Sequence, residues 1–306
     1  MGATEHGSSS PSPAYRGRVA ITGAAGLLGR AVIDACTRRG WETCAIVRSN
    51  APAGAVSSVQ ADLSAEGIRL QARMPSPPDA IIHLAAAVPH AAEFPDTAVT
   101  AELTRRIDRC VYAAAADWSI PVIYASSCGL YDRIDPSWKT EETPLRSASP
   151  YFEAKQDGEA LFLTLPQTAV MRLSALYGPG LRRHLVLARF ITLARTGQAL
   201  SVWGSGQREQ DFLHAADAAN FILAALDAAA KGIYNIASGQ PVTMMQLASL
   251  VTQILGGVVN REAKPDPLEC ETARYDIAKA KRDLGWFPTI NIEKGIVMLA
   301  GEVFGA

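Results

Sequence analysis

Three glycines spaced three residues apart, in the segment "ITGAAGLLGR", constrain the fold of this chain more than any other feature. Gly23, Gly26 and Gly29 stand between an apolar strand candidate, Arg18 to Thr22, and a segment with helical apolar spacing from Leu27 to Cys36. Glycines there allow a tight turn and a close backbone approach to a pyrophosphate, which then lies at the free N–H groups of the helix. The loop therefore predicts a dinucleotide site. The alternative is a glycine-rich turn without a ligand, and the flanking strand and helix argue against it.

Short apolar runs recur along the first half of the chain and alternate with helical segments. The expected strands are "RVAIT", "WETCAIV", "AVSSVQ", "DAIIHLA", "IPVIYAS" and "QTAVMRL", and a helix is expected from about Thr97 to Asp117. Buried apolar strands that alternate with helices are typical of a parallel sheet covered on both faces. We therefore expect an α/β fold with a doubly wound, Rossmann-type sheet, and a dinucleotide-binding domain over residues 18–177.

Beyond Tyr177 the alternation becomes irregular. "LVLARFITLARTG", "HAADAANFILAALDAAA" and "TMMQLASLVTQIL" predict helices, whereas "LSVWGSG" and "GIYNIAS" predict strands. We expect residues 178–306 to form a smaller, partly intertwined α/β lobe that mainly binds substrate, with some elements returning to the first domain. Residues 1–17 are rich in Gly, Ser and Pro, which predicts a disordered tail.

Composition argues against several classes of function. A formal net charge of −1 gives no reason to expect nucleic acid or an anionic membrane as a partner. No apolar run approaches the roughly 18 residues of a membrane span, and the first residues lack the apolar core of a signal peptide. Five scattered cysteines argue against a disulfide framework, so we expect a reducing, cytoplasmic setting. Five dispersed histidines predict no metal site.

The residue after the second strand bears on the choice of dinucleotide. An Asp or Glu about 20 residues beyond the glycine loop would hold the ribose hydroxyls of NAD. The second strand instead ends "AIVRSN", with Val47 at that place and Arg48 after it. The planar guanidinium of an arginine suits the 2′-phosphate of NADP. NADP is therefore favoured and NAD is the alternative, unless Arg48 is an ordinary solvated surface arginine.

A tyrosine and a lysine four residues apart, in "YFEAK", form a candidate catalytic pair. Tyr151 and Lys155 would lie on one face of a helix, one turn apart. Hydride transfer between a nicotinamide and a carbinol carbon needs a group that moves the hydroxyl proton. A free tyrosine has a pKa of about 10, and a nearby ammonium with a positive nicotinamide ring would lower it. The alternative is a Tyr and a Lys on a solvated helix face.

Eight short segments follow the order of one enzyme family. They are "TGAAGLLG", "ADL", "HLAA", "YASS", "YFEAK", "YGPG", "QDFLH" and "LGWFP". From Arg18 to the C-terminus the sequence resembles the extended short-chain dehydrogenase/reductase family, also called the NAD-dependent epimerase/dehydratase family. The resemblance implies that Ser127, Tyr151 and Lys155 are the catalytic trio. Ser127 is chosen over Ser126 because it lies three residues before Leu130 in "SCGLYD", where the family usually has "VYG".

The same resemblance implies a set of cofactor contacts. Lys155 would hold the nicotinamide ribose, Asp62 would contact the adenine, and the small alanines after His83 would line the cofactor groove. His83 itself is expected to be a satisfied core histidine, and the alternative for "HLAA" is plain strand-end core. The expected cofactor-binding residues are Gly23, Gly26, Leu27, Leu28, Gly29, Arg48, Asp62, Leu63, Leu84, Ala85, Ala86, Tyr151 and Lys155.

Departures from the family pattern bear on the substrate. Ala175 stands where nucleotide-sugar members usually carry Asn, Gln210 stands where they carry the Arg before "DF", and "ELTRRID" replaces the usual "NVxGT". A nucleotide-diphosphate sugar is therefore less expected than the family name suggests, because charged donors to the diphosphate are missing. Arg182, Arg183 and Arg208 are candidate replacements.

Ser127 would bond the substrate oxygen, and Cys128 is a further substrate-contact candidate. Sugar dehydratases of the family place an Asp-Glu pair directly after the catalytic hydroxyl residue. Cys128 and Gly129 occupy those positions and cannot do that acid–base work, so dehydratase chemistry is disfavoured.

Three functions compete. The leading hypothesis is an NADP-preferring oxidoreductase that acts on a secondary alcohol or ketone of a sugar-like substrate. The runner-up is a nucleotide-sugar epimerase that keeps NAD tightly bound. A protein that binds NADPH without turnover is the third, and the intact trio argues against it. The family often forms homodimers through the two helices that flank the catalytic strand, so a homodimer is expected from the resemblance alone.

Overall fold

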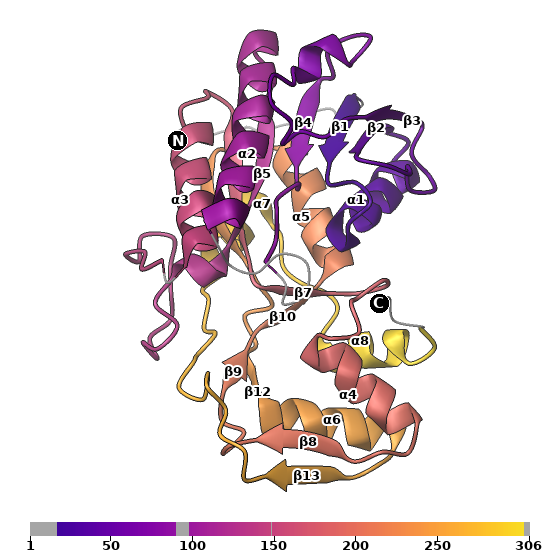
Figure 1. Cartoon of the computed structure of the whole chain (residues 1–306), viewed down its shortest axis with the longest axis vertical. Helices are drawn as coiled ribbons and strands as arrows, with labels where there is room; N and C mark the ends of the chain where they lie inside the picture. The colour runs from indigo at the N-terminus through magenta and orange to yellow at the C-terminus, as the bar shows by residue number, and fades with distance from the viewer. Residues whose placement is uncertain (1–16, 90–97, 148, 303–306) are drawn as a thin grey trace, which may run out of the picture.

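A seven-stranded parallel sheet forms the centre of the upper part of the molecule in a computed structural model that describes residues 17–89, 98–147 and 149–302 (Figure 1). The expected tail lies outside these residues, except for Gly17. The strands are β1 (Arg18–Thr22), β2 (Glu42–Val47), β3 (Ser57–Gln60), β4 (Ala80–His83), β5 (Val122–Ser127), β6 (Thr168–Leu173) and β11 (Gly232–Ile236). Their order is β11-β6-β5-β4-β1-β2-β3, and every neighbouring pair is parallel. The expected doubly wound fold is confirmed, and its strand order reverses between β1 and β4, where such sheets bind ligands.

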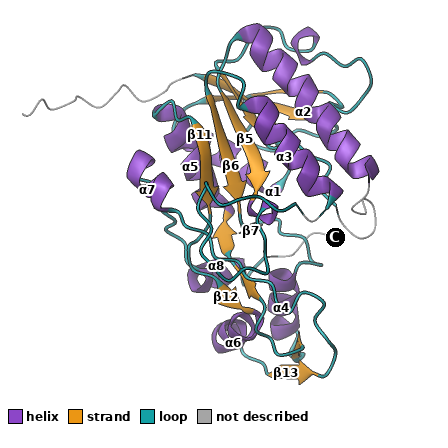
Figure 2. Cartoon of the chain, turned by 90° about the vertical axis from the view of Figure 1, so that its left-hand side faces the viewer, coloured by secondary structure: helices purple, strands orange, loops and turns teal. Residues whose placement is uncertain are grey.

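Helices cover both faces of this sheet (Figure 2). On one face α1 (Leu27–Arg38) packs against α5 (Ala215–Asp227), and on the other α2 (Ala98–Trp118) packs against α3 (Pro150–Phe162). Val32 and Phe221 belong to the core of the first face, and Val111 and Phe162 to the core of the second. The central strands are buried on both sides, which explains their nearly continuous apolar sequences.

A second lobe lies below the sheet in Figure 1. It consists of α4 (Val186–Arg195), β8 (Leu200–Trp203), β9 (Glu209–Gln210), β12 (Val242–Thr243), α6 (Met244–Leu255), β13 (Val259–Glu262) and α8 (Ile292–Leu299). Leu187, Phe190, Leu247, Val251 and Ile296 belong to its separate apolar core. Strands β7 (Ala175–Tyr177) and β10 (Phe212–His214) pair in parallel between the lobe and the sheet.

The chain passes between these two parts repeatedly. After β8 and β9 it returns through β10 to form α5 and β11, and it then leaves again for α6 and β13. It returns once more as α7 (Ala278–Leu284), which packs against β11, before ending in α8. Two single-turn 3₁₀ helices, η1 (Leu70–Ala72) and η2 (Cys128–Leu130), complete the described elements. The division of labour between a cofactor-binding and a substrate-binding part remains a prediction.

No helix in the described ranges is both long and apolar enough to cross a membrane.

Candidate active site

The glycine loop after β1 packs so closely against neighbouring backbone that side chains at two of its glycines would collide with it. Gly23 has φ +65°, and a Cβ there would lie 2.9 Å from the backbone nitrogen of Ala85. A Cβ on Gly29 would collide with the carbonyl oxygen of Gly23 and with the backbone of Ala24. Gly26 is the N-cap of α1 and supplies no capping side chain. The first turn of α1 therefore keeps backbone donors available for an anion, and the loop fits a dinucleotide pyrophosphate.

The other expected cofactor residues lie at the ends of β2, β3 and β4. Arg48 is exposed directly after β2, and its charge contributes to a lowered pKa of Asp62, whose main causes are hydrogen bonds from Ser64. The backbone nitrogens of Leu84 and Ala85 each donate to Thr22 Oγ1 at 3.1 Å. The two residues after β4 therefore lie beside the start of the glycine loop.

The remaining expected cofactor residues that follow the glycine loop, β3 and β4 differ in burial. Leu63 and Leu28 are buried, Ala86 is half-buried, and Leu27 packs against the core of the second lobe.

Lys155 lies at one end of a buried chain of polar side chains. It is 3% exposed, and its Nζ donates to Tyr124 Oη at 3.0 Å. Tyr124 in turn donates to Asp108 Oδ2 at 2.9 Å. The other carboxylate oxygen of Asp108 lies 2.9 Å from His83 Nε2, and His83 Nδ1 lies 2.7 Å from Thr22 Oγ1. The chain thus joins the β5–α3 region to the glycine loop.

The donors of this chain can be assigned from its end at Thr22. Since Thr22 Oγ1 accepts from two backbone amides, its own proton is directed to His83 Nδ1, which leaves Nε2 as the donor to Asp108. Burial lowers the pKa of His83, which agrees with a neutral ring. The expectation of a satisfied core histidine therefore fits its surroundings, and Asp108 accepts from both sides.

The charge of Lys155 is opposed by its burial and supported by two carboxylates. Burial lowers the pKa of Lys155, whereas Asp108 and Glu159 raise it. Tyr124 bridges the ammonium to Asp108, and its own pKa is raised well above the usual value, first by burial and then by Asp108. The side chain that would tune Tyr151 is therefore held in place by residues on α2 and β5.

Glu159, one turn after Lys155 on α3, anchors a second buried group. It receives Arg172 Nη2 on Oε2 at 2.7 Å and Arg172 Nε on Oε1 at 3.0 Å. The hydroxyl of Ser126 also donates to Glu159. Ser126 therefore points into this buried group, whereas Ser127 is half-buried at the end of β5, accepts from the Gly129 nitrogen at 3.0 Å and lines a cavity.

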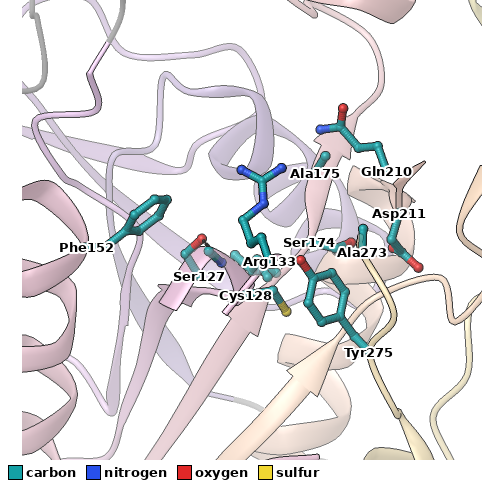
Figure 3. Close-up of a pocket in the computed structure, with 12 residues that line it drawn as sticks. Ser127, Cys128, Arg133, Phe152, Ser174, Ala175, Gln210, Asp211, Ala273 and Tyr275 are labelled. Carbon is teal, nitrogen blue, oxygen red and sulfur yellow. Dashed lines mark hydrogen bonds between the residues drawn. The ribbon is translucent and has the colours of Figure 1, made fainter. Parts of the chain in front are cut away.

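The cavity beside Ser127, which we call cavity 1, has a volume of about 170 Å³ (Figure 3). It lies where β5 and β6 end and the chain enters β7. Its lining combines hydroxyl, amide, charged and apolar side chains: Ser127, Cys128, Gly129, Arg133, Phe152, Leu173, Ser174, Ala175, Gln210, Asp211, Ala273 and Tyr275. Cys128 is buried, and burial raises the pKa of its thiol well above the usual value, which keeps the thiol protonated.

A second cavity, cavity 2, has a volume of about 150 Å³ and lies in the second lobe. It is lined by His184, Val186, Arg189, Phe190, Ser201, Val202, Trp203, Arg208, Met244 and Asp266. Arg208 forms an ion pair with Asp266 at 3.1 Å. Arg182 and Arg183, the other candidate phosphate donors, are exposed and line neither cavity 1 nor cavity 2.

Several residues around the site are not singled out by the sequence pattern. Tyr124 and Asp108 sit in "YASS" and "ELTRRID", where the segment is visible but the buried contact is not. An acidic residue on the apolar face of a predicted helix is a signal that could have pointed to Asp108. No group of three or more His, Cys, Asp or Glu side chains that could hold a metal occurs within the described part of the chain.

Comparison with known sequences gives one family match and several relatives. The profile of the family described as "NAD dependent epimerase/dehydratase family" matches residues 19–237. UDP-glucuronate 4-epimerase of Thermodesulfobacterium geofontis is 27% identical over 230 residues, which cover 71% of this chain and 70% of that protein. UDP-glucuronic acid decarboxylase 1 of Xenopus tropicalis is 28% identical over 193 residues, and the match spans 57% of this chain but only 45% of that protein.

Comparison with solved structures supports the fold. UDP-glucose 4-epimerase of Thermus thermophilus, solved in complex with NAD, superposes with a TM-score of 0.81 and 23% identity. The match covers 94% of this chain and 100% of that chain. At this level of identity the similarity shows a common architecture, including the second lobe.

Proposed function

Because the chain belongs to the NAD dependent epimerase/dehydratase family, we propose that it is an NADP-preferring oxidoreductase that interconverts a secondary alcohol and a ketone on a sugar-like substrate. The chain is an enzyme of the short-chain dehydrogenase/reductase type. The observation that carries the proposal is the placement of Lys155. Lys155 is buried one helical turn after Tyr151 and is bonded to Tyr124 on β5, the strand that ends at Ser127 in the wall of cavity 1, and this placement suits a role in proton transfer.

The glycine loop, the residues after β4 and Lys155 would hold the cofactor. When bound, a nicotinamide dinucleotide supplies the hydride acceptor or donor that this chemistry requires. Gly23 and Gly29 let the loop turn tightly and pack against neighbouring backbone, which is the role of glycines in a loop that binds a pyrophosphate at a helix N-terminus.

The side chains of the protein supply the proton transfer. We assign Tyr151 as the group that exchanges a proton with the substrate oxygen. Ser127, at the wall of cavity 1, would donate a hydrogen bond to the same oxygen. Lys155 would favour the ionised form of Tyr151 through its ammonium, whose charge Asp108 supports through Tyr124.

The preference for NADP rests on Arg48. It is exposed at the end of β2 and has no carboxylate beside it in the sequence, and its guanidinium can pair with a 2′-phosphate. The carboxylate that its charge reaches is Asp62. The T. thermophilus epimerase was solved with NAD, which makes NAD the alternative for this chain.

An epimerase with tightly bound NAD is the second candidate. The similarity to UDP-glucuronate 4-epimerase favours it. The ligand retained on purification separates the two: tightly held NAD would indicate the epimerase, and NADP that leaves on dilution would indicate the oxidoreductase.

We further propose a cytoplasmic setting and a homodimer. All five cysteines are free, which suits a reducing compartment. The dimer would use α2 and α3, the two helices that flank β5 in the family's usual arrangement.

Three single replacements test the catalytic assignment. Tyr151→Phe should lower turnover by about 10²–10⁴-fold and nearly keep cofactor affinity, because it removes only the proton path. Lys155→Ala should reduce both turnover and NADPH affinity. Ser127→Ala should lower turnover and spare the cofactor. Steady-state kinetics and NADPH fluorescence titration of each variant provide the measurements.

Ser126→Ala is the matched control. It removes a neighbouring hydroxyl that bonds Glu159, so it should lower stability while turnover of the folded enzyme changes little. Near-native turnover in Tyr151→Phe would show that the trio is misassigned.

A further inference from the structure

One arginine of each cavity is paired with a carboxylate of the same chain segment. In cavity 1 Arg133 Nη2 lies 2.6 Å from Glu271 Oε2, and the side chain of Glu271 is 16% exposed. In cavity 2 Arg208 Nε lies 3.1 Å from Asp266 Oδ2, and the side chain of Asp266 is 9% exposed. Both carboxylates lie between β13 and α7, so one segment supplies negative charge to both cavities.

These four groups form one electrostatic neighbourhood. Burial raises the pKa of Glu271, the positive charges of Arg133 and Arg208 lower it, and the charge of Asp266 raises it. The segment that leads into β9 contributes to both cavities, because Gln210 lines cavity 1 and Arg208, two residues earlier, lines cavity 2. A ligand that extends from one cavity to the other would therefore meet two guanidinium groups with their charges already balanced.

We propose that Asp266 and Glu271 determine substrate specificity by neutralising Arg208 and Arg133, so that the enzyme takes an uncharged sugar-like alcohol or ketone and excludes nucleotide diphosphates. This inference rests on the proposed function, because it names the substrate class of the same site. A diphosphate needs uncompensated donors, and a partly buried carboxylate beside an arginine repels it.

Apart from Asp211, whose carboxylate accepts hydrogen bonds from Ser238, the rest of cavity 1 suits an uncharged ligand that carries hydroxyl groups. The hydroxyls of Ser127 and Ser174, the amide of Gln210 and the phenol of Tyr275 can both donate and accept hydrogen bonds. Phe152, Leu173, Ala175 and Ala273 supply apolar surface to the same cavity, which suits the C–H face of a sugar ring.

The remaining basic groups of cavity 2 do not replace the paired arginines. Arg189 and His184 line this cavity, but both residues are exposed, where water and salt screen their charge. Arg208, by contrast, is only 21% exposed in its side chain and is paired with an acid that is buried more deeply. The cation best placed to bind a buried phosphate is therefore the one whose charge Asp266 balances, although Arg208 Nε itself makes no hydrogen bond within the described residues.

The test is calorimetry of the NADPH-saturated enzyme with two anionic probes, UDP and inorganic pyrophosphate. The native enzyme should bind UDP with a Kd above about 100 µM. Asp266→Asn removes the charge beside Arg208 and should strengthen binding of both probes by about tenfold or more, and adding Glu271→Gln should strengthen it further. Glu269→Gln is the matched control, because it removes the same charge from the same segment at a residue that bonds Ser205 instead of a cavity arginine. Its affinity for UDP should equal that of the native enzyme.

Two results would overturn the proposal: low-micromolar binding of UDP by the native enzyme, or unchanged UDP affinity in a folded Asp266→Asn, Glu271→Gln double variant. Thermal unfolding and NADPH titration show whether each variant is folded. If the variants do not fold, the UDP affinity of the native enzyme alone tests the proposal. Failure of the proposed function would be seen elsewhere, as absent NADPH binding or unchanged turnover in Tyr151→Phe.

Discussion

Lys155 belongs to a group of four buried charged side chains, on α2, α3 and β6, whose charges cancel. Lys155 and Arg172 are positive, Asp108 and Glu159 are negative, and each is at most 3% exposed. Removing one partner of a buried pair leaves an uncompensated charge and typically costs about 3–5 kcal/mol. The two acids therefore do more than hold α3 in place, because they decide over which pH range Lys155 keeps its proton.

Asp108→Asn should move the alkaline limit of activity to lower pH. Burial lowers the pKa of Lys155, and the charge of Asp108 opposes that lowering, so loss of the charge lowers the pKa further. In the proposed mechanism Lys155 acts as the ammonium, whose population falls as pH rises through this pKa. The alkaline limb of kcat/KM against pH should therefore shift to lower pH.

The control for this change is Asp157→Asn. Asp157 is an exposed carboxylate on the same helix as Lys155 and pairs with Arg105 at 2.7 Å, so its loss should leave the profile in place. Tyr124→Phe keeps every charge but removes the acceptor of Lys155, and turnover should fall without a comparable shift. An unchanged alkaline limb in Asp108→Asn would show that Asp108 does not support the charge of Lys155.

Arg48→Ala tests the choice of cofactor. The native enzyme should bind NADPH more tightly than NADH, because a guanidinium at the end of β2 can pair with the 2′-phosphate. Arg48→Ala should remove most of that difference by weakening NADPH alone. Fluorescence titration of both cofactors measures it, and equal dissociation constants in the native enzyme would exclude a role for Arg48 in the choice.

Helix α3 approaches β5 and α2 closely because of a glycine. A Cβ on Gly158 would collide with the hydroxyl of Tyr124 and lie 2.6 Å from Asp108 Oδ2. The space that Gly158 leaves is therefore the space in which the Lys155–Tyr124–Asp108 chain forms. Glycine lowers the intrinsic stability of a helix, so α3 loses helix propensity at this position while the polar chain gains the space it needs.

Gly158→Ala should destabilise the protein although alanine is the better helix former. Overpacking costs about 1–3 kcal/mol, against roughly 1 kcal/mol gained in propensity. Turnover should also fall, since Tyr124 must move. Ala160→Gly, at an exposed position of the same helix, measures the propensity contribution alone. Urea unfolding measures the free energy of unfolding of both variants. A Gly158→Ala variant more stable than the native protein would show that Tyr124 and Asp108 move aside at little cost.

The elements that the sequence predicts are those whose pattern is local. The apolar runs of β1, β2, β4, β5 and β6 are visible because both faces of each strand are buried. Helix α8 is not visible in the sequence, because Gly295 interrupts its pattern. A glycine is required there, because a Cβ would collide with the hydroxyl of Tyr177. Strands β7 and β10 have three residues each and exist only because they pair with one another.

The candidate site divides in the same way. Tyr151 and Lys155 can be recognised in the sequence because they are four residues apart. The glycine loop can be recognised because its glycines are three residues apart. The ion pair of Arg208 with Asp266 cannot be predicted from the sequence, because the two residues are far apart in the chain. The hydrogen bond from Ser126 to Glu159 cannot be predicted for the same reason. Such contacts depend on the folded arrangement of several elements and leave no local pattern.

The sheet of the first part is completed by residues from the second half of the chain. β11 pairs with β6, and α5 packs on α1. Without them β6 is an open edge, and apolar side chains of α1 such as Val32 lose part of their cover. The whole chain should therefore unfold as one cooperative unit.

A fragment of residues 1–177 tests this cooperativity. We expect it to lack fixed tertiary structure and to aggregate, because the uncovered edge of β6 and the bare face of α1 are exposed. Near-UV circular dichroism and size-exclusion chromatography report on both. Co-expression with residues 178–306 should restore a soluble complex, and a monomeric, folded 1–177 fragment would contradict the expectation.

The late arrival of β11 also has a consequence for synthesis on the ribosome. The strands from β1 to β6 leave the exit tunnel in order, but the partner of β6 follows only after α4, β8 and α5 have been translated. At about 5–20 residues per second, the unfinished sheet waits several seconds with one edge open. During that interval the nascent chain is a natural client for chaperones that cover exposed strands, and codon usage between β6 and β11 would set how long the exposure lasts.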